Sequence, residues 1–318
     1  MSQSFVTEGW FMNLPTTYSS LFSAIFSYNS LHYIMHIFRK TLFLLSLFVA
    51  GFTLQAKAQI SVMSFNIRLD ASVDNENRWD NRKGEVAKML TYYQPDLLGM
   101  QEVCPNQMAD LKAALNGIYE GIGVGRDDGK HQGEHSPIFY NKHKFSMVKH
   151  GDFALSETPE RFGKKGWDAS YNRVCTWAIL KDKKTGKQVV YFNTHLDNDG
   201  KIARKEGIKL ILSKMKKVAK NMPAIITGDF NCTDDEEPSA ILRANKMENA
   251  RNKAAIVYGP DWTWHDYGRL PLNERSIIDH VFISNQLKAT RYRVIGDKPD
   301  KVYLSDHNAV FVNLEFTK

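Results

Sequence analysis

The sequence has little cysteine, and its cysteines are isolated from one another. Cys104, Cys175 and Cys232 are odd in number, so the chain is not built on a disulfide framework. A single disulfide stays open as an alternative, but the sequence does not choose its pair. Internal repeats, low-complexity tracts and flexible linkers are also lacking, which excludes repeat architectures and disordered proteins.

Long hydrophobic runs are lacking too. The apolar run over residues 41–54 is too short for a confident membrane span. It follows a short basic region and precedes Ala56-Lys57-Ala58, a small-x-small cleavage pattern. This order predicts a secretory signal peptide over residues 35–58, with an uncleaved interfacial anchor as the alternative. No cysteine follows the run, so a lipid anchor is unsupported.

We therefore expect an exported protein, located in the periplasm, at the cell surface or outside the cell. We expect no stable membrane span after cleavage. Residues 1–34 stand in front of a complete signal, and we interpret them as a non-native upstream extension with Met35 as the true start. The remaining residues, 59–318, are read as one domain, and we expect a monomer.

The sequence shows no concentrated basic stripe. The chain carries a formal charge of +7, and residues 1–58 hold three basic residues and one acidic residue, which leaves +5 for the rest. This mild excess suits an anionic substrate but not a committed nucleic-acid binder. The lysine-rich segments 181–184 and 214–217 are interpreted as a solvated turn and a helix face.

Short apolar runs alternate with amphipathic segments of helical spacing in the first half of the domain. Later apolar runs follow one another closely. This pattern predicts an α/β fold: a four-layer α/β sandwich in which two packed, mainly antiparallel sheets are flanked by helices. The predicted helices are Arg82–Tyr93, Gln107–Leu115 and Ile202–Lys220. The predicted strands are Ile60–Ile67, Leu97–Gln101, Pro137–Tyr140, Val174–Leu180, Val189–Thr194, Ala224–Asp229, Ile277–Ser284 and Ala309–Phe316.

Polar side chains gather where these apolar runs end. A buried strand that stops in a carboxylate, amide or imidazole places that group on a rigid rim, which is a good position for a site. The groups are the carboxylates Glu102, Asp229, Asp279 and Asp306, the amides Asn66, Asn193 and Asn231, and the imidazoles His195 and His307.

This set of residues is typical of phosphate-ester hydrolysis. That reaction needs a hard cation to neutralise phosphate charge, an activated water and stabilisation of the leaving oxygen. Carboxylates dominate the set, which favours Mg²⁺ or Mn²⁺ as cofactor. Zinc would favour a ligand set rich in histidine or cysteine.

Six stretches in this order resemble the motifs of the endonuclease/exonuclease/phosphatase (DNase I-like) superfamily. The stretches are Ser64–Arg68, Met100–Val103, Asn193–Leu196, Gly228–Asn231, Ile278–Phe282 and Leu304–His307. The superfamily includes secreted deoxyribonucleases, abasic-site endonucleases, inositol polyphosphate phosphatases, neutral sphingomyelinases and deadenylases. The resemblance implies the same four-layer sandwich, with the site at the top of two facing sheets.

The resemblance also implies roles for the polar residues. Glu102 would hold the metal with Asn66 beside it, and Asp306 would be a second carboxylate on the metal side. Asp229 would orient or activate water, and Asn231 would bind the phosphate. His307, oriented by Asp279, would act as a base or bind phosphate, and His195 would stabilise the transition state or donate a proton.

One departure from the family pattern concerns the metal count. Some nuclease members carry an acidic residue two positions after the first Asn, whereas this chain has Arg68, so a second metal at that position is not expected. Structural alternatives also exist for individual residues. Asp229–Asn231 resembles an Asx turn, Asp279 a salt-bridge partner and His195 a buried structural histidine. The order of the six motifs favours function.

Loop residues are the candidates for substrate binding. They are Arg126, Trp167, Arg173 and, from the strand motif, Asn193. Aromatic and arginine side chains bind sugars, bases and phosphates alike. We expect a phosphate monoester or diester that is a small molecule or is linked to a glycan or lipid. The alternatives are a secreted nuclease acting on DNA or RNA, and a non-catalytic binding protein on the same fold.

Overall fold

The computed structural model describes Tyr33 and residues 35–41, 59–299 and 302–317. The chain divides into two units, residues 1–56 and 57–318. Most of the predicted upstream extension and signal peptide lies outside the described residues, and residues 35–41 are helical. None of the helices in the described parts of the chain has both the length and the hydropathy needed to cross a bilayer.

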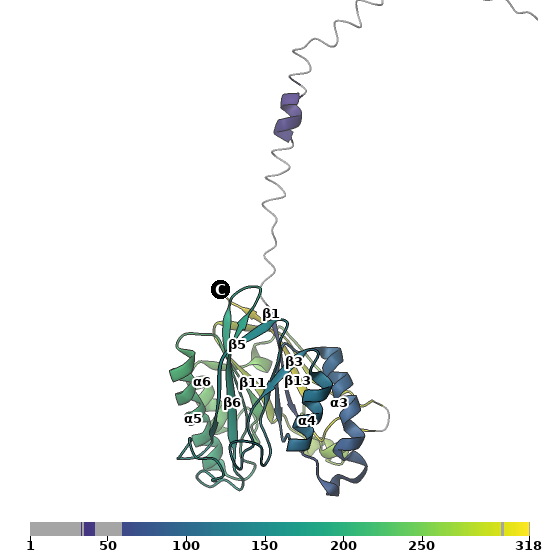
Figure 1. Cartoon of the computed structure of the whole chain (residues 1–318), viewed down its shortest axis with the longest axis vertical. Coiled ribbons are helices and arrows are strands. Elements are labelled where there is room, and N and C mark those ends of the chain that lie inside the picture. Colours follow the sequence, from purple (N-terminus) through teal and green to yellow (C-terminus); the bar gives the residue numbers. More distant parts are fainter. Residues whose placement is uncertain (1–32, 34, 42–58, 300–301, 318) are drawn as a thin grey trace, which may run out of the picture. The chain divides into compact units, whose positions relative to one another are not determined.

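Residues 57–318 contain two sheets that lie face to face (Figure 1). The seven-stranded sheet has the order β10-β12-β13-β1-β2-β4-β3 and the six-stranded sheet the order β5-β6-β7-β8-β11-β9. The strands are β1 (Gln59–Asn66), β2 (Leu97–Gln101), β3 (Tyr119–Ile122), β4 (Ile138–Asn141), β5 (Phe145–Ala154), β6 (Val174–Asp182), β7 (Gln188–His195), β8 (Ala224–Asp229), β9 (Met247–Asn249), β10 (Ile256–Tyr258), β11 (Asp279–Ser284), β12 (Leu287–Ile295) and β13 (Ala309–Phe316).

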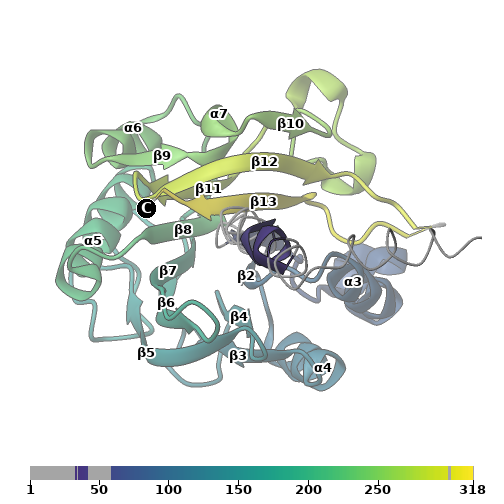
Figure 2. The same ribbon diagram turned by 90° about the horizontal axis from the view of Figure 1, so that it is seen from above.

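Helices cover the outer face of each sheet, as the view in Figure 2 makes clear. The helices α5 and α6 lie on the six-stranded sheet, and α3 and α4 lie on the seven-stranded sheet. The helices are α3 (Trp79–Tyr93), α4 (Pro105–Leu115), α5 (Lys201–Ala219), α6 (Glu237–Ala244) and α7 (Ala250–Lys253), with short 3₁₀ turns η1 (Ser72–Asn77), η2 (Asp266–Gly268) and η3 (Leu272–Glu274). The predicted four-layer α/β sandwich is confirmed.

The sheets are mixed, with most neighbouring strands antiparallel. The pairs β1–β2, β7–β8 and β10–β12 are parallel, and the other described pairs are antiparallel. Helical spacing explains how α5 is held in place. Its buried residues Ile208, Ile211, Leu212 and Met215 recur three and four positions apart, so they form one stripe against the sheet.

The space between the two sheets changes from apolar to polar along the strands. On β1, Ile60 and Val62 belong to the core between the sheets, and the next inward positions are Ser64 and Asn66. The same period of two on β8 leads from Ile225 in that core to Thr227 and Asp229. The inward-facing residues of each strand therefore change from apolar in the core to polar at the rim.

A buried polar layer joins the sheets just below that rim. The amide nitrogen of Asn193 on β7 donates to the backbone oxygens of Met100 and Pro137, which belong to the opposite side of the interface. Its amide oxygen accepts from Gln101 at 2.7 Å and from Thr227 at 2.9 Å. Because every polar atom of the Asn193 side chain is satisfied here, this residue fixes the distance between the sheets.

Gly99 makes room for this layer on β2. A Cβ at this position would lie 2.3 Å from Asn193 Oδ1 and 2.4 Å from Thr227 Oγ1. We expect Gly99→Ala to lower the free energy of unfolding by about 1–3 kcal/mol, because the sheets or the buried amide must shift. Urea unfolding of the purified domain measures this change.

Gly84 in the exposed face of α3 supplies the matched control. A Cβ there meets nothing within 4 Å. Gly84→Ala should stabilise the protein by up to about 1 kcal/mol through helix propensity alone. A Gly99→Ala protein as stable as the wild type would contradict the close packing of the two sheets at this layer.

Candidate active site

Strand register places three of the predicted residues in a row. His195 pairs with Asp229 between β7 and β8, and Asp229 pairs with Asp279 between β8 and β11. All three side chains lie at the same end of the six-stranded sheet, and all three are buried. The three side chains are therefore held in fixed positions next to one another by the sheet.

The seven-stranded sheet contributes Asn66 at the end of β1 and Glu102 just after β2. Arg68 and Glu102 have φ angles of 57° and 61°, a left-handed conformation that is uncommon for residues with a Cβ. The chain turns sharply at both points. Such strain is tolerated where the surrounding structure holds a functional geometry.

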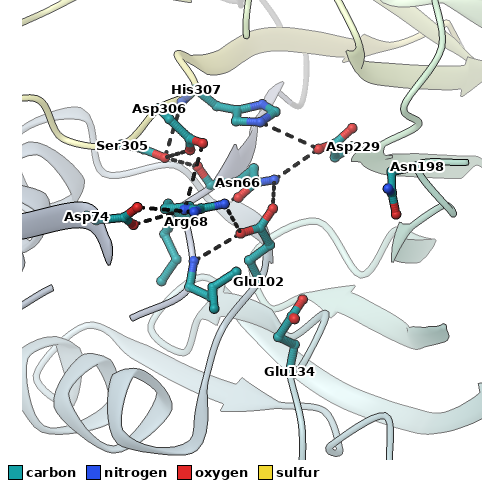
Figure 3. Close-up of polar contacts among 12 residues, drawn as sticks. Asn66, Arg68, Asp74, Glu102, Glu134, Asn198, Asp229, Ser305, Asp306 and His307 are labelled. Carbon is teal, nitrogen blue, oxygen red and sulfur yellow. Dashed lines mark hydrogen bonds and ion pairs between the residues drawn. The ribbon is translucent and has the colours of Figure 1, made fainter. Parts of the chain in front are cut away.

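Asn66 connects the two sheets at the site (Figure 3). Its side-chain nitrogen donates to Glu102 Oε1 and to Asp229 Oδ2, each at 2.9 Å. Its amide oxygen accepts from the backbone nitrogen of Arg68 at 2.9 Å. In this arrangement the nitrogen of Asn66, rather than the oxygen that a metal ligand would present, faces the two carboxylates.

Asp229 lies between two imidazoles. Its Oδ2 is 3.5 Å from His195 Nε2 and 3.7 Å from His307 Nε2. Its Oδ1 accepts from the backbone nitrogen of Asn231 at 2.9 Å, as in the Asx turn anticipated from the sequence. Burial, together with the negative charge of nearby Asp279, raises the pKa of Asp229 to about 7.

The two imidazoles have opposite electrostatic environments. Burial opposes protonation of His307, but the Asp279 carboxylate, 2.8 Å from its Nδ1, raises its pKa to about 10. Burial and the nearby charge of Arg173 lower the pKa of His195 well below its usual range. His195 Nε2 lies 2.9 Å from the amide nitrogen of Asn231, so it accepts that hydrogen bond in the neutral form.

Arg68 places a positive charge among three carboxylates. Its guanidinium makes two hydrogen bonds to Asp74, at 3.0 and 3.1 Å. It also lies 3.9 Å from an oxygen of Glu102 and 3.9 Å from an oxygen of Asp306 (Figure 3). The guanidinium thus compensates part of the negative charge on this side of the site.

The opposite side of the site is a wall of paired charges, which we call the ion-pair wall: Arg126, Glu134, Tyr171, Arg173 and Asn198. Arg126 binds the Glu134 carboxylate with two nitrogens, at 2.7 and 2.8 Å. Arg173 donates to Asn198 Oδ1 at 2.9 Å. The Tyr171 ring lies against both guanidinium groups, at 5.3 and 5.6 Å. Burial and the charge of Glu102 raise the pKa of Glu134 to about 7.

An open cleft of about 770 Å³ connects these groups. Eight predicted residues line it: Glu102, Arg126, Arg173, His195, Asp229, Asn231, Asp306 and His307. The cleft is also lined by Arg68, Tyr171, Glu134, Asn198 and Trp264, which are not among the predicted site residues. These residues come mostly from loops, where no periodic pattern signals which way a side chain points.

Four predicted residues are not among those that line the cleft. Asn66 and Asp279 lie directly behind it, bonded to Asp229 and His307 respectively. Asn193 lies one pleat below His195 on the same face of β7, within the polar layer between the sheets. Trp167 belongs to a loop in which its backbone nitrogen donates to Glu157. Asn193 is therefore enclosed between the sheets, and Trp167 is not among the residues that line the cleft.

The donor set fits a hard divalent cation. Ligand atoms of Glu102, His195 and Asp229 lie within 4.8 Å of one another. Burial raises the pKa of Asp229 and of Asp306, which also carries a carboxylate into the cleft. A bound cation would relieve the cost of burying these charges. Oxygen donors predominate, and the three cysteines are free and are not part of the group.

Two mixed sheets flanked by helices, with this carboxylate and imidazole cluster at one end, define the DNase I-like class of α/β sandwich. The chain belongs to the Endonuclease/Exonuclease/phosphatase family, whose profile matches residues 63–307. Phosphatases and nucleases both occur among its relatives.

The chain is similar to two solved structures over nearly the whole of each. The endonuclease/exonuclease/phosphatase from Bacteroides vulgatus is 40% identical, with 82% of this chain and 100% of that chain covered and a TM-score of 0.79. A mannosyl-6-phosphatase from Bacteroides thetaiotaomicron is 39% identical, with 81% and 100% covered and a TM-score of 0.76.

Similarity to curated proteins is lower. The 3'-5'-exoribonuclease subunit of the CCR4-Not complex from Yarrowia lipolytica is 22% identical over 315 residues, with 76% of this chain covered. The chain spans 34% and 44% of the lengths of the first two curated relatives it matches.

Asp197 anchors the ion-pair wall from behind. It accepts from Arg173 Nε at 3.2 Å and from the backbone nitrogens of Ser170, Tyr171 and Gly200. Burial alone would raise the pKa of Asp197, but the N–H donors of Ser170 and Gly200 and the charge of Arg173 hold it at about 2. The buried pair thus fixes both a cleft residue and the loop that carries Tyr171.

We expect Asp197→Asn to lower the free energy of unfolding at pH 7 by about 3 kcal/mol, since it leaves Arg173 buried without its charge partner. The pKa of Asp197 is lower in the folded state, so its stabilisation is present above about pH 4 and is lost as the pH falls toward 2. Urea unfolding at pH 7 and pH 3 should show the variant's deficit shrinking at the lower pH. A deficit of equal size at both would contradict the assigned charge state.

Proposed function

We propose that this protein is an exported phosphoesterase, dependent on Mg²⁺ or Mn²⁺, that removes phosphate from a small or carbohydrate-linked ester. The observation that carries the proposal is the position of Asp229. Its carboxylate lies between His195 and His307, at 3.5 and 3.7 Å, and shares the Asn66 amide with Glu102. Carboxylates and imidazoles around one point are what metal-assisted attack of water on phosphorus requires.

The metal would be held by Glu102 with the carboxylate oxygens of Asp229 and Asp306 nearby. When bound, it would neutralise charge on the phosphoryl oxygens and lower the pKa of a bound water. Asp229 would orient the attacking water and take its proton. A bond forms from the water oxygen to phosphorus as the bond from phosphorus to the alcohol oxygen breaks, and the alcohol oxygen takes its proton from solvent in the open cleft as it leaves.

The remaining groups would stabilise the phosphoryl oxygens. The buried Asp279 carboxylate stabilises positive charge on His307, which suits contact with an anionic oxygen. Asn231 and His195 line the cleft beside Asp229 and are bonded to each other at 2.9 Å, so they hold this edge of the cleft in place. Arg68 and Arg173 add positive charge on two sides.

Two observations support a small or carbohydrate-linked ester. The mannosyl-6-phosphatase that resembles this chain is 39% identical and is covered along its whole length. The mature charge of +5, without a basic stripe, does not favour tight binding of a long polyanion. A nuclease is the second candidate, supported by the exoribonuclease relative. Export rests on the signal-peptide pattern of residues 35–58.

A panel of substrates tests the proposal. With Mg²⁺, the purified domain should release phosphate from p-nitrophenyl phosphate and from hexose 6-phosphates, and should nick plasmid DNA weakly or not at all. Asp229→Asn and His307→Ala should each lower kcat about 100-fold, because each removes a group engaged in the chemical step. The exposed residues Asp261 and His150 offer the matched controls Asp261→Asn and His150→Ala.

The outcomes separate the candidates. Plasmid nicking without hydrolysis of monoesters would favour the nuclease. Equal and negligible activity of the wild type and of His307→Ala on every substrate would favour a binding protein on this fold. Full activity in Asp229→Asn would contradict the site itself.

A further inference from the structure

The ion-pair wall contains a negative charge that phosphate chemistry does not explain. Glu134 lines the cleft, and its carboxylate is held in place by Arg126 through one hydrogen bond at 2.8 Å and an ion-pair contact at 2.7 Å. Figure 3 shows the Glu134 carboxylate pointing into the same open region as Asn198 and Glu102. A carboxylate beside a phosphate dianion costs free energy through repulsion. Glu134 must therefore face a part of the substrate other than the phosphate.

The ion-pair wall still has polar atoms that can bind a ligand, and hydrogen-bond acceptors and donors lie next to each other among them. Glu134 Oε2 accepts a hydrogen bond from Arg126 and Oε1 makes an ion-pair contact with it, and both oxygens keep lone pairs for further donors. Arg126 keeps N–H groups that Glu134 does not use, and the structure gives no partner to the amide nitrogen of Asn198 among the described residues. Adjacent fixed acceptors and donors match neighbouring hydroxyl groups, which donate and accept at once.

The wall is also rigid before any ligand arrives. Tyr171 lies against the guanidinium groups of Arg126 and Arg173, and Arg173 is fixed by the buried Asp197. The Tyr171 side chain is held between these two contacts and remains half exposed at the cleft. A pre-organised polar wall binds hydroxyl groups with little further loss of side-chain entropy.

We propose that the ion-pair wall is the subsite for the leaving alcohol, that this alcohol is a polyhydroxylated compound such as a sugar, and that Glu134 accepts hydrogen bonds from its hydroxyl groups. This inference rests on the proposed function, because it assumes that the phosphate lies at Asp229 and His307. Glu134 is then a specificity residue that acts on the alcohol and takes no part in the attack on phosphorus.

Glu134→Gln and Glu134→Ala test the proposal through the ratio of two activities. The probes are mannose 6-phosphate, whose alcohol carries several hydroxyl groups, and p-nitrophenyl phosphate, whose alcohol carries none. Both variants should lower kcat/KM for mannose 6-phosphate about tenfold or more, chiefly by raising KM, since hydrogen bonds to a charged group are lost. The kcat/KM for p-nitrophenyl phosphate should fall by about threefold at most.

Glu160→Gln is the matched control, because Glu160 is 76% exposed and pairs with Lys214 away from the cleft. The ratio of the kcat/KM values for the two probes should be the same in Glu160→Gln as in the wild type. Thermal unfolding of each variant checks the fold, and Glu134→Gln keeps the size of the side chain if Glu134→Ala unfolds.

Failure of this inference is distinct from failure of the proposed function. A wild type that hydrolyses both probes, with Glu134→Gln lowering both values by the same factor, would overturn the alcohol subsite and leave the phosphoesterase standing. A wild type that hydrolyses neither probe would overturn both. A 2',3'-dideoxynucleoside 5'-phosphate, whose alcohol carries no other hydroxyl group on the sugar, that loses activity in Glu134→Gln as steeply as mannose 6-phosphate would contradict a site built for hydroxyl-rich alcohols.

Discussion

The hydrogen bonds from one amide group, that of Asn66, hold the site together across the two sheets. Asn66 and Glu102 belong to the seven-stranded sheet, whereas Asp229 ends a strand of the six-stranded sheet. A fully buried neutral donor thus connects two carboxylates that would otherwise repel each other. The arrangement depends on the distance between the sheets, which the buried layer around Asn193 and Gly99 sets. The two carboxylates of the site and the close packing of the sheets are therefore linked through one residue.

The strands that carry the six motifs could all be predicted from the sequence, because each is an apolar run with an abrupt polar end. The strands that were missed have other patterns. In β5 the central residues are exposed, and in β12 charged residues alternate with apolar ones, so neither forms an apolar run. The helix α6 has only eight residues, with a proline near its start, and so short a helix gives no clear apolar period.

The site residues divide in the same way. Those at strand ends, such as Asp229 and Glu102, were found because burial and polarity change at a fixed point in the chain. Asn193 was assigned to substrate because it shares a motif with His195, but a residue one pleat deeper on the same face is enclosed between the sheets. Glu134 and Asn198 were not among the predicted site residues, because a loop sequence does not specify the direction of a side chain and only their partners in space show what they face.

The central claim is that Glu102, joined to Asp229 through Asn66, holds a divalent cation at the rim between the sheets. A crystal of the domain grown with Mn²⁺ and a phosphate analogue tests it most directly, through the anomalous scattering of the metal. The account predicts a peak bonded to Glu102 and facing Asp229, with His307 still bonded to Asp279. A peak elsewhere in the molecule, with no density for a cation in this cleft, would contradict it.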